Sequence, residues 1–316
     1  MNSIASINSA IDEIEKVIIG KKDIVEMLMI ALLCEGHVLI EDVPGVGKTT
    51  LASALGKSTG LFCKRAQFTP DVMASDITGF TMFNKELNKF EYRSGMVMTN
   101  ILLADEINRT TPKTQSALLE AMEEKQVSVD GTVHKLPKPF MVIATQNCHG
   151  YVGTFALPEA QLDRFFFKLT IGYPSLEEEL NIIIDRKNQN PINNVNSILS
   201  KEEIIYHIDS VKNVDVDRNI LKYIVALVSK TRQDPMIELG ASPRASISLM
   251  RAAQGYAYIK GRSYVVPEDV IRVISAVLSH RIILSQEAKI KKVTINSILR
   301  RIVSNVTPPY RGMANG

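Results

Sequence analysis

A glycine-containing loop followed by lysine and threonine is the first group of residues in this chain whose types and spacing could do chemistry. An apolar run leads into the loop and a helix-like segment follows; the residues between are Val43, Pro44, Gly45, Val46, Gly47, Lys48, Thr49 and Thr50. Small residues let backbone N–H groups close around phosphate oxygens, and the following helix adds the positive end of its dipole. In such a P-loop, Lys48 reaches the β- and γ-phosphates and the Thr49 hydroxyl binds Mg²⁺. The loop therefore predicts a site for ATP and Mg²⁺.

The loop departs from the usual P-loop pattern at its first position. The pattern G-x-x-x-x-G-K-[ST] begins with glycine, whereas this chain has Asp42 there. Because only the second half of the motif is present, the prediction of an ATP site depends on residues further along the chain.

Two acidic residues end a short apolar run downstream of the loop. The run at 100–104 is typical of a buried strand, and Asp105 and Glu106 follow it. Asp105 is placed to hold Mg²⁺, directly or through water, and Glu106 to polarise a water for attack on the γ-phosphate. The alternative is a core strand with an acidic, solvated end, and the P-loop upstream disfavours that alternative.

A third apolar run, at 140–145, also ends in polar residues, among them Asn147. In a parallel sheet with crossover helices, the carboxyl ends of the strands line the ligand crevice. We therefore expect Asn147 to hydrogen-bond the attacking water or the γ-phosphate. The alternative for an asparagine at a strand end is an ordinary turn residue.

Composition favours a cytoplasmic globular enzyme without a membrane segment. The chain has 316 residues, 45% of them hydrophobic and 22% charged, with a formal net charge of +3. This charge is too small to require a nucleic-acid partner. Its three cysteines contain no CxxC pair, so neither a zinc site nor a disulfide framework is predicted. The most apolar helix-like run, at 27–34, is too short to span a bilayer.

The order of the apolar runs predicts an α/β domain followed by a helical one. Amphipathic helices are expected near 4–17 and 22–33, and strands before the P-loop and near 62–68, 101–104, 140–145 and 167–171. Five short apolar strands separated by helices indicate a parallel sheet in a three-layer sandwich. After Pro174 the pattern is helical only, so we place an α/β nucleotide-binding domain at 1–174 and a helical domain at 175–316.

Two hairpin insertions interrupt the α/β pattern. Valines alternate around Asp130-Gly131, the usual pair of a type I′ turn, and predict a hairpin near 126–135. A second hairpin is expected near 79–95. Exposed hairpins are often only tolerated insertions, but two of them beside a nucleotide crevice are better explained as working loops that move with nucleotide state.

Taken in order, these motifs resemble those of the AAA+ ATPases, and within them the MoxR family, over nearly the whole chain. The resemblance rests on residues 39–49, 67–71, 105–115, 144–147, 157–165 and 242–245. Acidic residues before the Pro-Gly are common in that family, so Asp42 agrees with it. The resemblance implies a P-loop AAA+ core with a parallel five-stranded sheet, followed by a smaller all-helical lid.

The resemblance also implies a ring, commonly a hexamer, with ATP bound between subunits. Asn147 then resembles sensor 1, Arg164 the arginine finger that reaches the neighbour's γ-phosphate, and Arg244 the sensor 2 of the lid. Planar, permanently charged guanidinium groups suit a transition state whose charge is spread over phosphoryl oxygens. The alternatives are a salt bridge between Arg164 and Asp163, and a solvated helix start at Arg244.

Other residues gain roles from the same resemblance. Ile18 and Ile19 lie in a segment similar to the one that packs against adenine, although a plain turn between helices is compatible with the same residues. Arg109 and Lys113 lie either at the subunit interface or on solvated helix starts, and the sequence does not decide between the two.

The biology implied is chaperone-like remodelling or activation of partner proteins. MoxR proteins often work with a partner that carries a von Willebrand factor A domain. A magnesium-chelatase-like ATPase subunit is the main alternative, because it shares the hairpins and the motif at 162–165. A nucleic-acid motor is disfavoured, since the basic stretch at 289–292, with Arg300 and Arg301, lacks interleaved aromatic residues. A small-molecule kinase is disfavoured, because a water-activating Glu106 and a trans Arg164 serve hydrolysis and not phosphoryl transfer to a bound acceptor. A non-hydrolysing nucleotide switch would keep Lys48 but would not need Glu106.

Overall fold

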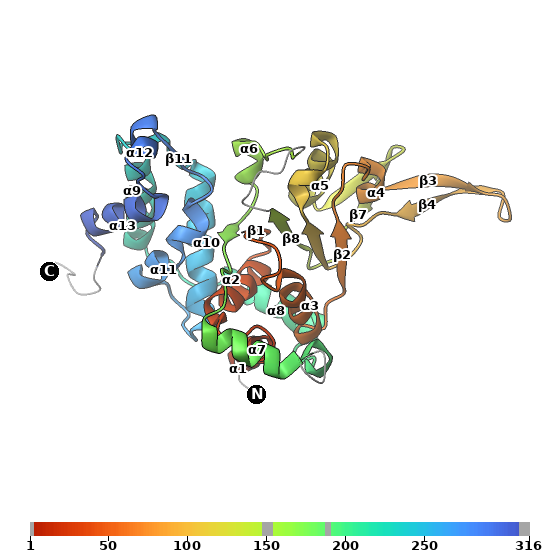
Figure 1. Ribbon diagram of the computed structural model, residues 1–316, viewed down its shortest axis with the longest axis horizontal. Coiled ribbons are helices and arrows are strands. Elements are labelled where there is room, and N and C mark those ends of the chain that lie inside the picture. The colour runs from red at the N-terminus through yellow and green to blue at the C-terminus, as the bar shows by residue number, and fades with distance from the viewer. Residues whose placement is uncertain (1–2, 147–153, 187–190, 310–316) are drawn as a thin grey trace.

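A five-stranded parallel sheet lies at the centre of the protein. The computed structural model describes residues 3–146, 154–186 and 191–309 (Figure 1). The strand order is β2-β5-β8-β1-β9, with every neighbouring pair parallel; the strands are β1 (Val38–Glu41), β2 (Cys63–Gln67), β5 (Ile101–Asp105), β8 (Met141–Gln146) and β9 (Phe167–Leu169). Each overlaps a stretch for which the sequence predicts a strand, with β5 and β8 ending one residue later than predicted, and the predicted α/β core is confirmed.

Both faces of the sheet are buried, because successive side chains of a strand point to opposite faces. Val38 and Ile40 of β1 belong to one hydrophobic core, whereas Leu39 between them belongs to the other. In β5 the same alternation places Leu103 in the first core and Leu102 in the second. The apolar runs in the sequence are continuous for this reason.

Helices cover the two faces and complete three layers. The first face packs against α1 (Ser3–Glu15), α2 (Lys22–Leu33) and α3 (Lys48–Ser58), and the second against α4 (Ala74–Thr78) and α5 (Pro112–Glu124). Short helices η1 (Ile107–Arg109) and α6 (Glu159–Leu162) lie in the connections after β5 and β8. The first helix ends earlier than the sequence pattern predicts, at Glu15 rather than residue 17.

The second part of the chain is mainly helical, and most of its helices gather at one end of the molecule (Figure 1). These elements are α7 (Leu176–Arg186), η2 (Pro191–Asn194), α8 (Lys201–Lys212), α9 (Arg218–Thr231), α10 (Pro243–Ile259), α11 (Pro267–Leu278), α12 (Gln286–Ile290) and α13 (Ile295–Asn305). The sequence pattern misses a small antiparallel sheet of β10 (Ile237–Leu239) and β11 (Ile283–Leu284). These strands are too short to produce a recognisable alternation.

The helical part packs directly on the N-terminal helices. A side chain at Gly255 of α10 would meet the Cys34 sulfur and the Ile30 side chain at 2.8 Å, so α10 and α2 approach closely there. One continuous core therefore runs from the sheet through α2 into the helices of the second part. The division of the chain at Pro174 stays a prediction.

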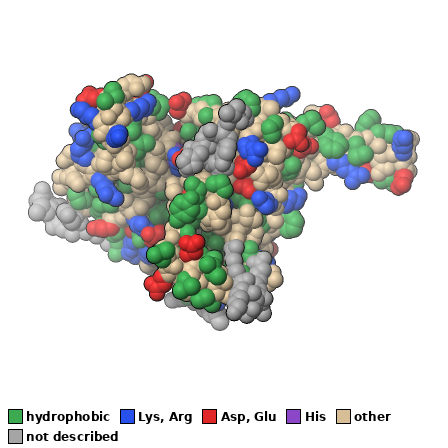
Figure 2. Space-filling view, in the orientation of Figure 1, with side chains coloured by type: hydrophobic (Ala, Val, Ile, Leu, Met, Phe, Trp, Pro, Cys, Tyr) green, Lys and Arg blue, Asp and Glu red, His purple; other side chains and the backbone are tan. Residues whose placement is uncertain are grey.

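Both expected hairpins are present. The longer one, β3 (Gly79–Asn84) with β4 (Lys89–Ser94), projects from the body as an arm (Figure 1), and the shorter pairs β6 (Gln126–Val129) with β7 (Thr132–Lys135). Asp130 and Gly131 have φ values of 49° and 77°, as a type I′ turn requires. The rings of Tyr92 and His134 stack with centroids 3.7 Å apart, which joins the two hairpins. Hydrophobic side chains are visible along the arm (Figure 2). Phe90 of β4 is among the exposed hydrophobic residues.

His37 fixes the amino-terminal end of β1. Its Nδ1 accepts the Val142 backbone N–H at 3.0 Å, so its Nε2 carries the proton and donates to the Met122 carbonyl at 3.1 Å. Complete burial disfavours the charged imidazolium and lowers the pKa of His37 to about 4.

We expect His37 to make folding stability depend on pH. The unfolded chain takes up this proton near pH 6.5 and the folded chain only near 4, so stability is lost as the pH falls through that interval. Between pH 7 and 5 the loss attributable to His37 is about 2 kcal/mol. Urea unfolding of His37→Gln at both pH values should show a pH-dependent loss smaller by about that amount. An unchanged pH dependence would contradict the buried, neutral histidine.

Candidate functional site

The glycines of the predicted P-loop have the backbone conformation that the loop requires. Gly45 and Gly47 have φ values of 87° and 90°, a left-handed region that L side chains rarely adopt. Gly47 is the N-cap of α3, so the loop leads directly into the N-terminus of that helix. This arrangement of glycines at a helix N-terminus is suited to binding a phosphate group.

Lys48 is held inside the loop by main-chain contact. Its side chain is buried, and Nζ donates to the Asp42 carbonyl oxygen at 3.1 Å. Ile18 is also buried, and its Cδ1 lies 3.9 Å from the position of a Cβ built on Gly47. The segment that resembles an adenine contact thus lies beside the phosphate loop, with Ile19 half-buried next to it.

The hydroxyl of Thr145 connects the two predicted acidic residues across neighbouring strands. Its Oγ1 donates to Asp105 Oδ1 at 2.6 Å and accepts the Glu106 backbone N–H at 2.9 Å. Arg65 of β2 forms an ion pair with the other carboxylate oxygen of Asp105 at 2.8 Å. The carboxyl end of β8 therefore fixes the position of the acidic pair at the end of β5.

The Glu106 carboxylate is itself tied to two neighbouring side chains. Glu106 has left-handed backbone angles of φ 58° and ψ 49°, and its Oε2 accepts hydrogen bonds from Gln67 Nε2 at 2.9 Å and Arg109 at 2.8 Å. The sequence does not decide whether Arg109 lies at a subunit interface or on a solvated helix start. In the structure it contacts the acidic pair of its own subunit. Lys113 is exposed at the start of α5.

One predicted residue of the site, Asn147, lies outside the described residues. The last described residue of β8, Gln146, donates from Nε2 to Glu41 Oε1 at 2.7 Å. The carboxyl ends of β8 and β1 are thereby joined beside the P-loop.

The two predicted arginines, Arg164 and Arg244, share one carboxylate. Glu123, near the end of α5, forms an ion pair with Arg164 Nε through Oε2 at 3.1 Å. Its Oε1 accepts a hydrogen bond from an Arg244 guanidinium nitrogen at 2.7 Å. Asp163 does not pair with Arg164, because it binds Arg281 at 2.7 Å. The Arg281 side chain is only 2% exposed, which makes it a structural anchor for this segment.

The two arginines and the P-loop lie at opposite ends of strand β1. The arginines line a cavity of about 190 Å³ together with Gly36 and His37, which precede β1, whereas the P-loop follows the other end of that strand. Four residues of strand separate the two ends by about 13 Å. Neither guanidinium is therefore placed to serve the P-loop of its own subunit.

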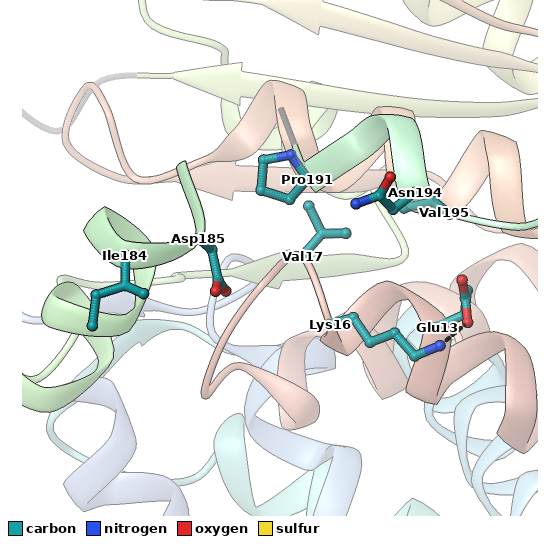
Figure 3. A pocket seen from close by; sticks show the side chains of 8 residues that line it. All are labelled: Glu13, Lys16, Val17, Ile184, Asp185, Pro191, Asn194 and Val195. Carbon is teal, nitrogen blue, oxygen red and sulfur yellow. Dashed lines mark hydrogen bonds and ion pairs between the residues drawn. The ribbon is translucent and has the colours of Figure 1, made fainter. Parts of the chain in front are cut away.

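A further cavity, of about 350 Å³, lies beside the segment that contains Ile18 (Figure 3). Its walls include Val17, Ile184 and Pro191 as apolar surfaces and Lys16 and Asp185 as charged ones. None of the P-loop residues lines it, so it is separate from the phosphate position.

Comparison with known proteins agrees with these motifs and this geometry. Residues 37–167 match the ATPase family associated with various cellular activities (AAA), and residues 229–302 match the AAA lid domain. The chain is 50% identical to YeaC of Bacillus subtilis (strain 168), covering 98% of this chain and 96% of that protein. It is 39% identical to Chaperone MoxR1 of Mycobacterium tuberculosis, covering 96% and 82% respectively. The chain belongs to the MoxR family of AAA+ ATPases.

The fold agrees with a solved relative of the same class. A crystal structure from Cytophaga hutchinsonii, of a protein assigned as an ATPase, superposes with a TM-score of 0.91 at 38% identity and covers 98% of this chain and 96% of that one. Within the described residues of this MoxR-family protein, no helix is long and apolar enough to cross a membrane.

We expect Thr145→Val to impair hydrolysis without preventing nucleotide binding. Valine keeps the volume but can neither donate to Asp105 nor accept the Glu106 N–H, so the acidic pair loses its fixed position. Steady-state ATPase activity should fall about ten- to hundredfold. Thr145→Ser keeps the hydroxyl and is the matched control, which should retain most of the activity. Retained activity in Thr145→Val together with a loss in Thr145→Ser would indicate that packing of the methyl group, and not the hydroxyl, is responsible.

Proposed function

We propose that this protein is an ATP-hydrolysing ring protein. Two arginines from a neighbouring subunit complete each nucleotide-binding site. The observation that carries the proposal is the position of Arg164 and Arg244. They lie side by side near the amino-terminal end of β1, whereas the P-loop of the same subunit follows its carboxyl end. The two guanidinium groups lie too far from the P-loop of their own subunit to contact a phosphate bound there. Their positive charge is complementary to phosphate bound at the P-loop of another copy.

The chemistry at the P-loop edge uses groups of one subunit. Backbone N–H groups of the loop and the Lys48 ammonium bind the phosphates, and Glu106 polarises the attacking water. Gln67 and Arg109 both donate to Oε2 of Glu106, so that oxygen has to lose these partners before it can accept a proton from water. Asn147 is proposed to orient the water, and Ile18 and Ile19 to contact the base.

The hydroxyl and carboxylate oxygens beside the P-loop are suited to binding Mg²⁺. Thr49 lies in the first turn of α3 and Asp105 is the last residue of β5. Mg²⁺ prefers oxygen ligands such as their hydroxyl and carboxylate groups, together with substrate phosphates and water. Bound Mg²⁺ would offset the negative charge of the phosphates. Thr145 and Arg65 hold the Asp105 carboxylate in position for this role.

Glu123 keeps the arginine pair compatible with an unassembled subunit. Two adjacent guanidinium groups repel each other, and the carboxylate between them compensates for that repulsion. At an assembled interface the γ-phosphate of the neighbour offers both arginines a stronger, doubly charged partner. We therefore propose that Arg164 and Arg244 act together in trans. On assembly, both would leave Glu123 and bind the γ-phosphate of the neighbouring subunit.

For the biological role, we propose chaperone-like remodelling or activation of partner proteins by a ring, commonly a hexamer. The relative named Chaperone MoxR1 supports this role, and a protein with a von Willebrand factor A domain is the proposed partner. A chelatase-like ATPase subunit is the alternative. A nucleic-acid motor is disfavoured because Lys291 pairs with Glu287 and Arg301 with Asp234.

We expect two inactive variants to restore hydrolysis when mixed. Arg164→Ala lacks the trans arginine and Glu106→Gln lacks the water-polarising carboxylate, so each alone should bind ATP but hydrolyse it poorly. In an equal mixture, roughly a quarter of the interfaces combine an intact Glu106 with an intact neighbouring Arg164 if subunits assemble at random. Up to about that share of parent activity should return, and it should rise with protein concentration.

The matched control is the double variant Arg164→Ala/Glu106→Gln, which cannot complete an interface with either single variant and should restore nothing. If the single variants also fail to restore activity in rings shown to exchange subunits, Arg164 does not act in trans.

A further inference from the structure

Asp42, the residue that departs from the P-loop pattern, connects the phosphate loop to a distant part of the chain. Its carboxylate is buried, and Oδ2 accepts the backbone N–H groups of Ile171 at 2.6 Å and Gly172 at 2.7 Å. Its other oxygen, Oδ1, accepts the N–H of Val43 at 2.8 Å. One side chain therefore holds the first turn of the loop and the end of the edge strand together.

The residues held by Asp42 begin the connection that leads out of the sheet. Ile171 and Gly172 follow β9, Gly172 has a φ of 71°, and α7 begins at Leu176. Lys21, which follows the segment beside the P-loop, donates from Nζ to the Tyr173 carbonyl at 3.0 Å. The exit from the sheet into the helical part is thus fixed at two successive points, and Asp42 supplies the buried one.

The backbone of Asp42 contacts the group that binds phosphate. Its carbonyl oxygen accepts the hydrogen bond from Lys48 Nζ at 3.1 Å, and its N–H donates to Gln146 at 3.2 Å. A bound phosphate competes with the Asp42 carbonyl for the Lys48 ammonium, and the ionised partner is the stronger acceptor. Loss of the Lys48 hydrogen bond to phosphate would free the Asp42 carbonyl, while the Asp42 carboxylate still holds residues 171 and 172.

We propose that Asp42 is a positioning residue that transmits occupancy of the phosphate loop to the chain segment leading into the helical lid. The inference rests on the proposed ATPase function and adds a route by which ATP alters the position of the lid. Asp42 touches no reacting atom, and its effect runs through the Lys48 contact on one side and the Ile171 and Gly172 amides on the other.

Asp42→Gly tests the proposal, because it creates the regular P-loop glycine while removing all three carboxylate contacts. The Kd for MgATP, measured by titration calorimetry, should stay within about threefold of the parent, whereas kcat should fall about tenfold or more. Hydrogen exchange of a peptide spanning 168–176 should differ between the apo and ATPγS-bound parent protein. In Asp42→Gly that peptide should exchange faster and no longer respond to nucleotide.

Asp42→Asn retains one acceptor oxygen and should recover part of both kcat and the exchange response; it also serves as the test if the glycine variant does not fold. The control is Asp269→Asn, which alters another buried carboxylate that accepts a backbone N–H, in α11. It should keep the exchange response of residues 168–176 even where it lowers the melting temperature.

The inference is overturned if Asp42→Gly keeps the parent kcat, or if its 168–176 peptide still responds to nucleotide. Absence of ATPase activity in the parent protein would instead refute the proposed function, and the exchange measurement would still decide whether Asp42 carries the response.

Discussion

Burial of both faces of the parallel sheet is the constraint on which the rest of the structure depends. Because alternate residues of β1 and β5 enter two separate cores, these two strands carry a charged side chain only at their carboxyl ends, Glu41 and Asp105. The carboxyl ends carry the phosphate loop and the acidic pair, and the arginines lie at the amino-terminal end of β1. Under the proposed function, a nucleotide bound at the carboxyl ends of the strands therefore meets the arginines of a second copy of the chain.

Reactive groups at both edges are held by partners within the chain. Glu106 is bonded to Gln67 and Arg109 at one edge, and Glu123 is bonded to both arginines at the other. Each of these contacts involves a charged group, and a phosphate or a water can take the place of one of its partners. The same physical account applies to Lys48, whose hydrogen bond to the Asp42 carbonyl is available for exchange with phosphate.

The sequence predicts the strands, the P-loop and the type I′ hairpin because each depends on local pattern: apolar runs, small residues, and Asp130-Gly131. It does not predict Gln67, Thr145 or Glu123, since their partners come from strands and helices that are neighbours only in space. The order β2-β5-β8-β1-β9 differs from chain order, and only that order brings Gln67 and Thr145 beside the acidic pair. The sequence shows that Asp42 departs from the motif. Its hydrogen bonds to residues 171 and 172 depend on the position of β9 beside β1, which the sequence does not predict.

The central claim is that the nucleotide lies between subunits and that both arginines reach it from the neighbour. A cryo-electron microscopy structure of the assembled Glu106→Gln variant with MgATP tests this most directly. We expect Arg164 and Arg244 of one subunit to contact the γ-phosphate held by Lys48 of the next, with Glu123 no longer bonded to either. Arginines that remain on Glu123 in the nucleotide-bound assembly, or a γ-phosphate enclosed by groups of a single subunit, would contradict the account.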